Sequence, residues 1–251
     1  MLKTMLIILF ILFIWSFLIE PNLLAVKHYK IEALKGIRIV FVSDFHISKY
    51  NKGRLERVVR LINKQNPDIV LSGGDFIKGH DGKYTLPIEE QAEILKGVNA
   101  PFVTVLGNHD GWYDRERVTK ALRENGFTIL ENSNVKINNL YIAGIEDLQT
   151  GKPDINRALE NTQAPRIVLT HSPDIYYDVK EPVELILAGH THGGQVSFPP
   201  FGAPAVPSKY GSKFAKRIIK ETENTMIITK GIGTSILPVR FCAVPEIVVI
   251  N

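Results

Sequence analysis

Short apolar runs recur along the chain, and they alternate with amphipathic segments in the first half. Apart from Arg38, Ile37–Val42 is apolar and rich in β-branched residues, which indicates a buried strand. Leu55, Val58, Val59 and Ile62 recur at helical spacing and predict an amphipathic helix. The same alternation predicts a strand at 69–71, a helix at 88–98, a strand at 102–106 and a helix at 115–125 that begins after Asp114 as its N-cap.

Beyond residue 129 the apolar runs follow one another without long helical segments between them. They predict strands at 135–137, 140–143, 166–170, 184–188, 196–198, 218–220, 226–229 and 247–250, with one short helix at 155–159. No internal repeat or low-complexity tract divides this region. The mixture favours an α/β chain of the α+β type, in which two packed sheets are flanked by helices.

The amino-terminal segment differs from the rest because Met5–Ile19 contains a single polar residue, Ser16. Fifteen helical residues rise about 22 Å, short of a bilayer core of about 30 Å, and extension to Val26 passes Glu20. An uncleaved anchor, a cleaved signal peptide and a buried core helix are the alternatives. The segment has no small-residue cleavage site, which favours a membrane anchor at residues 1–26 before a folded domain at 36–251.

Charges on the two sides of this segment bear on its orientation. Lys3 precedes the apolar run, whereas Lys27, Lys30, Lys35 and Arg38 follow it. The positive-inside rule therefore favours a domain on the cytoplasmic face of the inner membrane, held by a single anchor.

The composition narrows the class of partner. The 251 residues suit one large domain with a sizeable core. The formal charge is +4 and the isoelectric point about 9.0, but no basic run exists. Nucleic acid is therefore not expected, while anionic lipids and phosphate substrates are compatible. Cys242 is the only cysteine, which excludes an internal disulfide, and the oligomeric state is left open.

Polar motifs directly follow five of the apolar runs. These motifs are Asp44-Phe45-His46, Gly74-Asp75, Gly107-Asn108-His109-Asp110, His171 and Gly189-His190-Thr191-His192. The carboxyl ends of strands in an α/β arrangement share one edge of the sheet, and ligands bind there. The five loops are therefore predicted to converge.

The loops contain aspartate, asparagine and histidine, which are residue types that bind metal ions in proteins. Residues two apart in an extended segment point the same way, so Asp44 and His46 can reach one metal together, and His190 and His192 can approach from the opposite side. The carboxylate of Asp75 can bridge two cations. The Asn108 amide oxygen and the His171 imidazole add two further ligands. Two metals about 3.5–4 Å apart can hold a phosphate ester and promote its hydrolysis.

Nitrogen and oxygen ligands without thiolate permit several divalent metals. Mn²⁺ is the first expectation, and Fe, Zn or Co are also compatible.

The ordered motif set D-x-H, GD, GNHD, H and GHTH resembles the signature of the calcineurin-like metallophosphoesterase superfamily over residues 36–251. The resemblance implies a four-layer αββα sandwich. It also implies two metal sites that share Asp75. The first would add Asp44, His46 and His192, and the second would add Asn108, His171 and His190.

Two further roles are implied by the same resemblance. His109 would protonate or electrostatically stabilise the leaving oxygen, and Asp110 would orient the His109 ring. Asp110 could instead serve only as a helix N-cap.

Segments beyond the metal motifs are similar to the membrane-associated bacterial branch of the superfamily, which includes phosphodiesterases and UDP-2,3-diacylglucosamine pyrophosphatases of lipid A synthesis. These segments are Gly189–Gln195, Val206–Gly211, Lys230–Ser235 and Pro238–Phe241. The resulting hypothesis is a two-metal hydrolase of a phosphodiester or pyrophosphate bond in a lipid-linked substrate. The alternatives are a broad-specificity phosphodiesterase or phosphatase of the cell envelope and a non-catalytic, metal-bound binding module.

Three more residues are candidates for substrate binding. Arg240 could contact a phosphate with its planar guanidinium or form a structural salt bridge. Lys209 could likewise contact a phosphate or serve a structural role. His80, which follows the Gly74-Asp75 loop, could contact substrate or lie in solvent.

Overall fold

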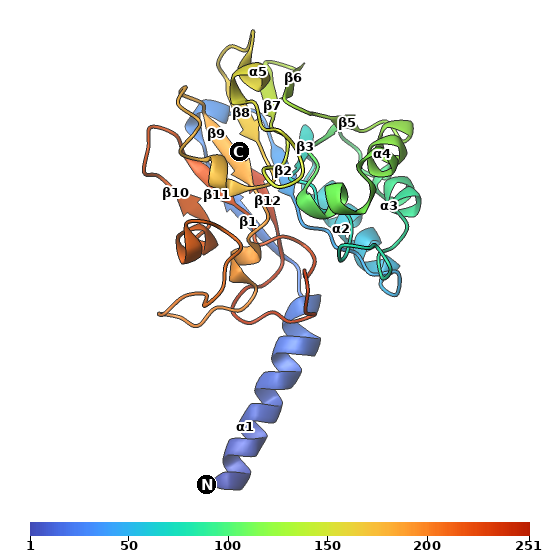
Figure 1. Cartoon of the computed structure of the whole chain (residues 1–251), viewed down its shortest axis with the longest axis vertical. Helices are drawn as coiled ribbons and strands as arrows, with labels where there is room; N and C mark the ends of the chain where they lie inside the picture. Colours follow the sequence, from blue (N-terminus) through green and yellow to red (C-terminus); the bar gives the residue numbers. More distant parts are fainter.

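Two six-stranded sheets pack face to face in the computed structural model, which describes residues 1–251 (Figure 1). Along the first sheet the strands are β1 (Ala25–Tyr29), β12 (Glu246–Ile250), β2 (Ile39–Val42), β3 (Ile69–Ser72), β4 (Phe102–Thr104) and β5 (Thr128–Ile129). Along the second they are β10 (Ile218–Ile219), β11 (Met226–Ile228), β9 (Leu185–Ala188), β8 (Arg166–Leu169), β7 (Leu140–Gly144) and β6 (Ser133–Ile137).

Both sheets are mixed, and their central strands are parallel. In the first sheet β2, β3, β4 and β5 pair in parallel, while β12 is antiparallel to β2. In the second sheet β7, β8, β9 and β11 are parallel neighbours, and β6 and β10 are antiparallel edge strands. Parallel neighbours place their carboxyl ends at the same edge, which is where the polar loops leave each sheet.

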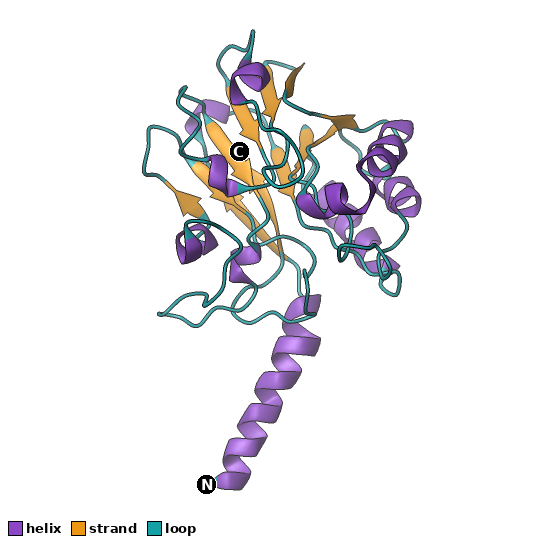
Figure 2. Cartoon of the chain, viewed as in Figure 1, coloured by secondary structure: helices purple, strands orange, loops and turns teal.

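Helices cover the outer faces of this pair of sheets (Figure 2). The first sheet is covered by α2 (Lys52–Lys64), α3 (Ile88–Leu95) and α4 (Asn108–Glu124), and the second carries the short α5 (Ile155–Leu159). Strand alternation explains the layers, because Val40 and Val42 of β2 pack with the helices whereas Ile39 and Phe41 face the second sheet. The predicted arrangement of two packed sheets flanked by helices is confirmed.

Helix α4 begins earlier than the sequence predicted. It starts at Asn108, but the backbone at Asp114 leaves the helical region with φ −172° and ψ 88°. The Asp114 carboxylate accepts a hydrogen bond from the Arg117 amide at 3.0 Å. The predicted N-cap is therefore present, but one further helical turn precedes it and carries the Asn108-His109-Asp110 motif.

The structure differs from the strand predictions at β1, at the two-residue strand β5 and at the segment 196–198. Strand β1 was not predicted, because it forms by parallel pairing with β12 at the other end of the chain. The predicted strand at 196–198 is wrong: Val196 and Phe198 make only isolated bridges, to Phe241 and Gly202. Pro199 and Pro200 follow directly and cannot donate to a strand ladder.

The amino-terminal segment is helical throughout residues Leu2–Asn22 and projects from the domain (Figure 1). It consists of α1 (Leu2–Ile14), a π-helical turn η1 (Trp15–Ile19) and a 3₁₀ turn η2 (Glu20–Asn22). It is 21 residues long and strongly apolar up to Ile19, and α1 has no buried residue. A length of about 31 Å makes it long enough to cross a membrane. The helix thus extends past the fifteen-residue apolar run and includes Glu20, although it ends before Val26.

Candidate metal centre

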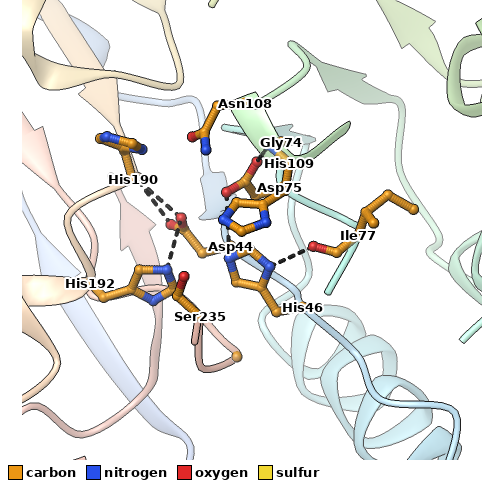
Figure 3. Close-up of polar contacts among 12 residues, drawn as sticks. Asp44, His46, Gly74, Asp75, Ile77, Asn108, His109, His190, His192 and Ser235 are labelled. Carbon is orange, nitrogen blue, oxygen red and sulfur yellow. Dashed lines mark hydrogen bonds and ion pairs between the residues drawn. The ribbon is translucent and has the colours of Figure 1, made fainter. Parts of the chain in front are cut away.

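The polar loops that follow five strands meet at one point between the two sheets (Figure 3). Loops after β2, β3 and β4 arrive from the first sheet, and loops after β8 and β9 arrive from the second. All the predicted metal ligands lie in these loops, and none is more than 7% exposed: Asp44, His46, Asp75, Asn108, His171, His190 and His192. The predicted convergence is therefore what the structure shows.

The backbone of these loops adopts unusual torsion angles at five of the predicted ligands. Asp44, His46, Asp75, His190 and His192 all have positive φ, between 41° and 69°. Side chains other than glycine rarely occupy this left-handed region, and each such residue costs free energy that the surrounding structure must offset. Five such residues in one cluster indicate that side-chain direction, rather than local backbone preference, determines the conformation here.

Asp75 lies at the centre of the cluster. Its Oδ2 atom is 3.4 Å from His46 Nε2 and 3.4 Å from His171 Nε2. Its Oδ1 atom accepts a hydrogen bond from the His109 amide at 2.9 Å. One carboxylate thus faces donor atoms on both sides, which is the position of a ligand shared by two cations.

The first donor group consists of Asp44, His46 and His192, whose donor atoms lie within 4.8 Å of one another. His46 Nδ1 lies 2.6 Å from the Ile77 carbonyl oxygen, which can only accept, so Nδ1 carries the proton of the neutral ring. His46 Nε2 then presents a lone pair, and this buried atom has no hydrogen-bond partner. An orphaned lone pair facing carboxylates fits a cation ligand.

The second donor group surrounds His171. Its Nδ1 atom donates to the Gly73 carbonyl at 2.7 Å, as the outer nitrogen of a metal-bound histidine does. Its Nε2 atom lies 2.9 Å from Asn108 Oδ1 and 3.0 Å from His190 Nδ1. Three acceptor-type atoms that converge in this way, beside the Asp75 carboxylate, fit a second cation.

The buried carboxylates of the cluster need a positive charge beside them to stay ionised. Burial raises the pKa of Asp75 well above its usual range and also raises the pKa of Asp44. Burial alone would lower the pKa of His171, but the carboxylates of Asp75 and Asp44 outweigh it and raise this pKa to about 9. The carboxylates are thus balanced either by a proton on His171 or by cations. The donor set fits divalent metal ions.

A cavity of about 480 Å³ opens over this cluster. Its floor includes His109, His190 and His192, and part of its wall is Trp112. The His109 ring lies 5.1 Å from the Trp112 ring, and its Nδ1 is 2.9 Å from the Gly79 carbonyl oxygen. Burial lowers the pKa of His109 to about 4 and that of His190 to about 3.

Several residues of this cavity were not identified from the sequence, among them Trp112 and Gln149. Trp112 comes three residues after His109 in α4, so the two side chains share a helix face, and that spacing could have identified it. Gln149 places its Nε2 atom 3.3 Å from His190 Nε2 and lines the cavity. Nothing in the sequence around Gln149 marks it. His80, a predicted substrate contact, does line the cavity, with its ring 4.3 Å from Trp112.

Asp110 differs from its predicted role. Its carboxylate does not hold the His109 ring, whose Nδ1 faces the Gly79 carbonyl instead. It accepts from four backbone amides, at distances of 2.8 to 3.2 Å: Asp75, Phe76, Ile77 and Gly107. The bond from Gly107 is of the capping-box kind, which is close to the alternative of a helix cap. The other three fix the turn that carries Asp75.

The two basic candidates for substrate binding lie outside the cavity. Arg240 is fully buried, and its guanidinium donates to the carbonyl oxygens of His192, Ala243 and Gly233. It therefore neither faces a phosphate nor forms the salt bridge that was the alternative. Its Nη2 atom lies 3.1 Å from His192 Nδ1, so Arg240 helps to fix the orientation of the His192 ring. Lys209 Nζ lies over the Tyr210 ring, away from the cavity.

Comparisons with known proteins agree with this geometry. Residues 37–194 match the sequence model of the calcineurin-like phosphoesterases. The chain is 32% identical to the uncharacterised metallophosphoesterase YkuE of Bacillus subtilis, over 92% of this chain and 86% of that protein. It is 29% identical to the phosphodiesterase YaeI of Escherichia coli, over 85% and 81%. It is 28% identical to a transmembrane protein with a metallophosphoesterase domain from Danio rerio, over 86% and 53%.

Proposed function

The chain belongs to the calcineurin-like phosphoesterase family and is a metal-dependent phosphoesterase, and from this premise we propose that it hydrolyses a phosphodiester or pyrophosphate bond in a lipid-linked substrate. One observation carries the proposal. Asn108, His190 and His192 of the two donor groups line a cavity whose wall is partly apolar, with Trp112, Val206 and Ile236. A phosphate group at the floor would thus have apolar surface beside it.

The residues fall into two sets that would hold the metal ions. Asp44, His46 and His192 would bind the first ion, and Asn108, His171 and His190 would bind the second, with Asp75 shared. Two bound cations would neutralise phosphate charge and make water a competent nucleophile at neutral pH. The chain supplies the geometry: the Ile77 and Gly73 carbonyls fix the His46 and His171 rings with Nε2 directed inward.

His109 would move the proton in this reaction. Its Nδ1 atom donates to the Gly79 carbonyl, which leaves Nε2 for the substrate. The low pKa caused by burial keeps the ring neutral at pH 7. A bound phosphate, being negatively charged, favours the protonated ring. The protonated Nε2 could then donate to the leaving oxygen as a general acid.

We propose Mn²⁺ as the preferred metal, with Fe, Zn or Co as alternatives. The support is the donor set, which combines imidazole, carboxylate and amide oxygen without thiolate.

For the substrate we propose UDP-2,3-diacylglucosamine, whose pyrophosphate joins a nucleotide to an acylated sugar. A cavity of about 480 Å³ is of the size that small-molecule sites have, and its polar floor and apolar wall suit an amphiphile. The alternative is a broad-specificity phosphodiesterase of the cell envelope. The likeness to YaeI, which is named a phosphodiesterase, favours this alternative.

We further propose that the amino-terminal helix is retained as a single anchor in the inner membrane. The Glu20 carboxylate is 1% exposed and accepts hydrogen bonds from the amides of Cys242 and Ala243, at 3.1 and 2.6 Å. Cleavage at any bond beyond Glu20 would leave these two amides without their acceptor. Lys27, Lys30 and Lys35 after the helix support a cytoplasmic domain. Reporter fusions after residue 251 would test this orientation.

The decisive experiment compares two substrates on purified full-length protein in detergent with Mn²⁺. UDP-2,3-diacylglucosamine and bis(p-nitrophenyl) phosphate are assayed beside an Asp75→Asn control. Preference for the lipid-linked substrate supports the proposal, and preference for the soluble diester supports the broad phosphodiesterase. If the protein binds two metals and hydrolyses neither substrate nor any other phosphoester, it is a binding module.

A further inference from the structure

Two loops beside the end of the amino-terminal helix expose large apolar side chains. The 195–202 loop exposes Phe198 (48%) and Phe201 (91%), and the 234–243 loop exposes Ile236 (85%) and Leu237 (58%). Single exposed apolar residues are common, but a group of large ones at adjacent loop tips marks an interaction surface. We call these two segments the loop pair.

The loop pair is one structural unit. The Ser197 amide donates to the Phe241 carbonyl at 2.8 Å, and the Phe241 amide donates to the Gln195 carbonyl at 3.1 Å. The Gln195 side chain adds two bonds, one to the Leu237 carbonyl at 3.1 Å and one from the Ser235 amide at 2.8 Å. The two apolar tips are thus held together by backbone and side-chain hydrogen bonds.

The same unit is attached to the end of the helix. The Arg240 amide donates to the Ser16 carbonyl at 2.9 Å, and Glu20 accepts from the loop amides of Cys242 and Ala243. The Trp15 indole donates to Glu20 at 2.7 Å. Because these bonds cross between the helix and the loop, the helix does not hinge freely at this junction. Figure 1 shows the helix leaving the domain next to these carboxy-terminal loops.

We propose that the loop pair lies on the surface of the lipid bilayer that the helix crosses, with its four apolar tips inserted among the headgroups. This inference rests on the proposed anchoring. Helix length is the deciding quantity. The whole helix, Leu2–Asn22, is about 31 Å long and matches a hydrocarbon core of about 30 Å, but residues 1–15, ahead of the first hydrogen bond to the loop pair at Ser16, span only about 22 Å. To cross the core, the helix needs its last turns, Ser16–Asn22, and these turns carry the bonds to the loop pair, so the junction with the domain lies at the membrane interface. The loop pair is bonded to that junction and goes with it.

The side chains suit this place. Phe and Trp side chains, together with aliphatic tips, insert at the boundary between headgroups and acyl chains. Trp15 lies at the level of the junction and satisfies its indole through Glu20. The bilayer is therefore the occupant that accounts for both the exposed tips and the short span ahead of Ser16.

Docking in this way places the cavity beside the lipid surface. Ser235 and Ile236 of one loop and Gln195 of the other line the cavity wall. A molecule that is embedded by its acyl chains could then present a phosphate to the cavity without leaving the bilayer.

Site-directed fluorescence on the full-length chain tests the docking. In a Cys242→Ser background, single cysteines replace Phe201 and Leu237, which do not line the cavity, and are labelled with an environment-sensitive fluorophore. Glu116→Cys, at an exposed position of α4, is the matched control. The proteins are reconstituted in vesicles of phosphatidylethanolamine and phosphatidylglycerol.

The expected result is a blue-shifted emission at positions 201 and 237, quenching by nitroxide-labelled lipid, and quenching by aqueous iodide several-fold weaker than at position 116. Equal iodide quenching at all three positions would overturn the docking. Flotation of the same vesicles separates the causes of failure. A chain that does not float overturns the anchor and the docking together, whereas a chain that floats with water-exposed labels overturns the docking alone. Hydrolysis of a soluble diester reports on the proposed function independently.

Discussion

The carboxylate of Asp110 accepts a hydrogen bond from the backbone amide of Asp75 at 2.8 Å. Asp110 therefore positions the backbone of Asp75, the proposed shared metal ligand, and does not act on the neighbouring His109 ring. Further bonds from the amides of Phe76 and Ile77 complete the turn. Asp75 has a positive φ, which is an unfavourable backbone conformation for an aspartate. The four hydrogen bonds to the buried Asp110 carboxylate help to offset this cost.

Substitution Asp110→Asn tests this role. An asparagine keeps one acceptor oxygen but turns the other into an amide nitrogen, so at least one buried amide is left unsatisfied. We expect a loss of about 1–3 kcal/mol in the free energy of unfolding. Metal affinity should fall about 10- to 100-fold, as when support behind a ligand is removed. Urea unfolding and metal titration measure the two effects.

Asp114→Asn is the control for Asp110, because it changes an N-cap away from the metal centre. It should cost well under about 1 kcal/mol, since asparagine caps nearly as well as aspartate. An Asp110→Asn protein with unchanged metal affinity would contradict the role in holding the Asp75 turn.

Substitution His109→Ala separates proton transfer from metal binding. Because His109 lies at the floor of the cavity with one ring nitrogen held by Gly79, we expect kcat to fall about 10²- to 10⁴-fold. Bound metal, measured by atomic emission, should stay at the wild-type level. His80→Ala, at the wall of the same cavity, should reduce kcat much less. Loss of metal from His109→Ala would make this residue a ligand instead.

Metal removal should destabilise the folded chain. The carboxylates of Asp44 and Asp75 are buried together, and cations that bind only the folded state offset their repulsion. Free metal at 100 times its dissociation constant adds about 2.7 kcal/mol of stability. Dialysis against EDTA should therefore lower the melting temperature by several degrees, and Mn²⁺ should restore it while Ca²⁺ restores it less. An identical melting temperature before and after chelation would contradict a metal centre made of these residues.

Arg240→Ala should be strongly destabilising although the residue touches no substrate. The guanidinium is fully buried and satisfies the carbonyls of His192, Ala243 and Gly233. Each carbonyl left unsatisfied costs about 1–3 kcal/mol, so we expect a total loss of at least about 3 kcal/mol in urea unfolding. Arg240→Lys should recover little, because an ammonium cannot reproduce the planar fork.

Arg60→Ala is the matched control for Arg240, because Arg60 is exposed on α2. Its loss should change the free energy of unfolding by less than about 0.5 kcal/mol. Equal stability of the Arg240→Ala and Arg60→Ala proteins would show that the buried guanidinium contributes nothing to the loop behind His192.

Much of the fold could be predicted from local pattern. Ile39–Val42 is a continuous apolar run, and this pattern alone implies a strand buried on both faces, as the two core clusters on either side of β2 show. Strand β1 could not be predicted in this way, because its pairing partner β12 lies at the opposite end of the chain. The same limit applies to the helix, whose last turns continue past Ile19 because Ser16 and Glu20 are bonded to the 234–243 loop.

By itself the sequence determined which side chains could meet a metal, because Asp44, His46, Asp75 and the histidines follow apolar strands whose carboxyl ends share an edge. Only the tertiary structure decided what holds them there. Asp110 bonds to amides on another loop, and Arg240 reaches His192 across 48 positions of chain. Such contacts depend on the packing of distant segments, and no spacing along the chain encodes them. The proposed metal ligands can therefore be recognised in the sequence, whereas the residues that hold them in position can be identified only in the fold.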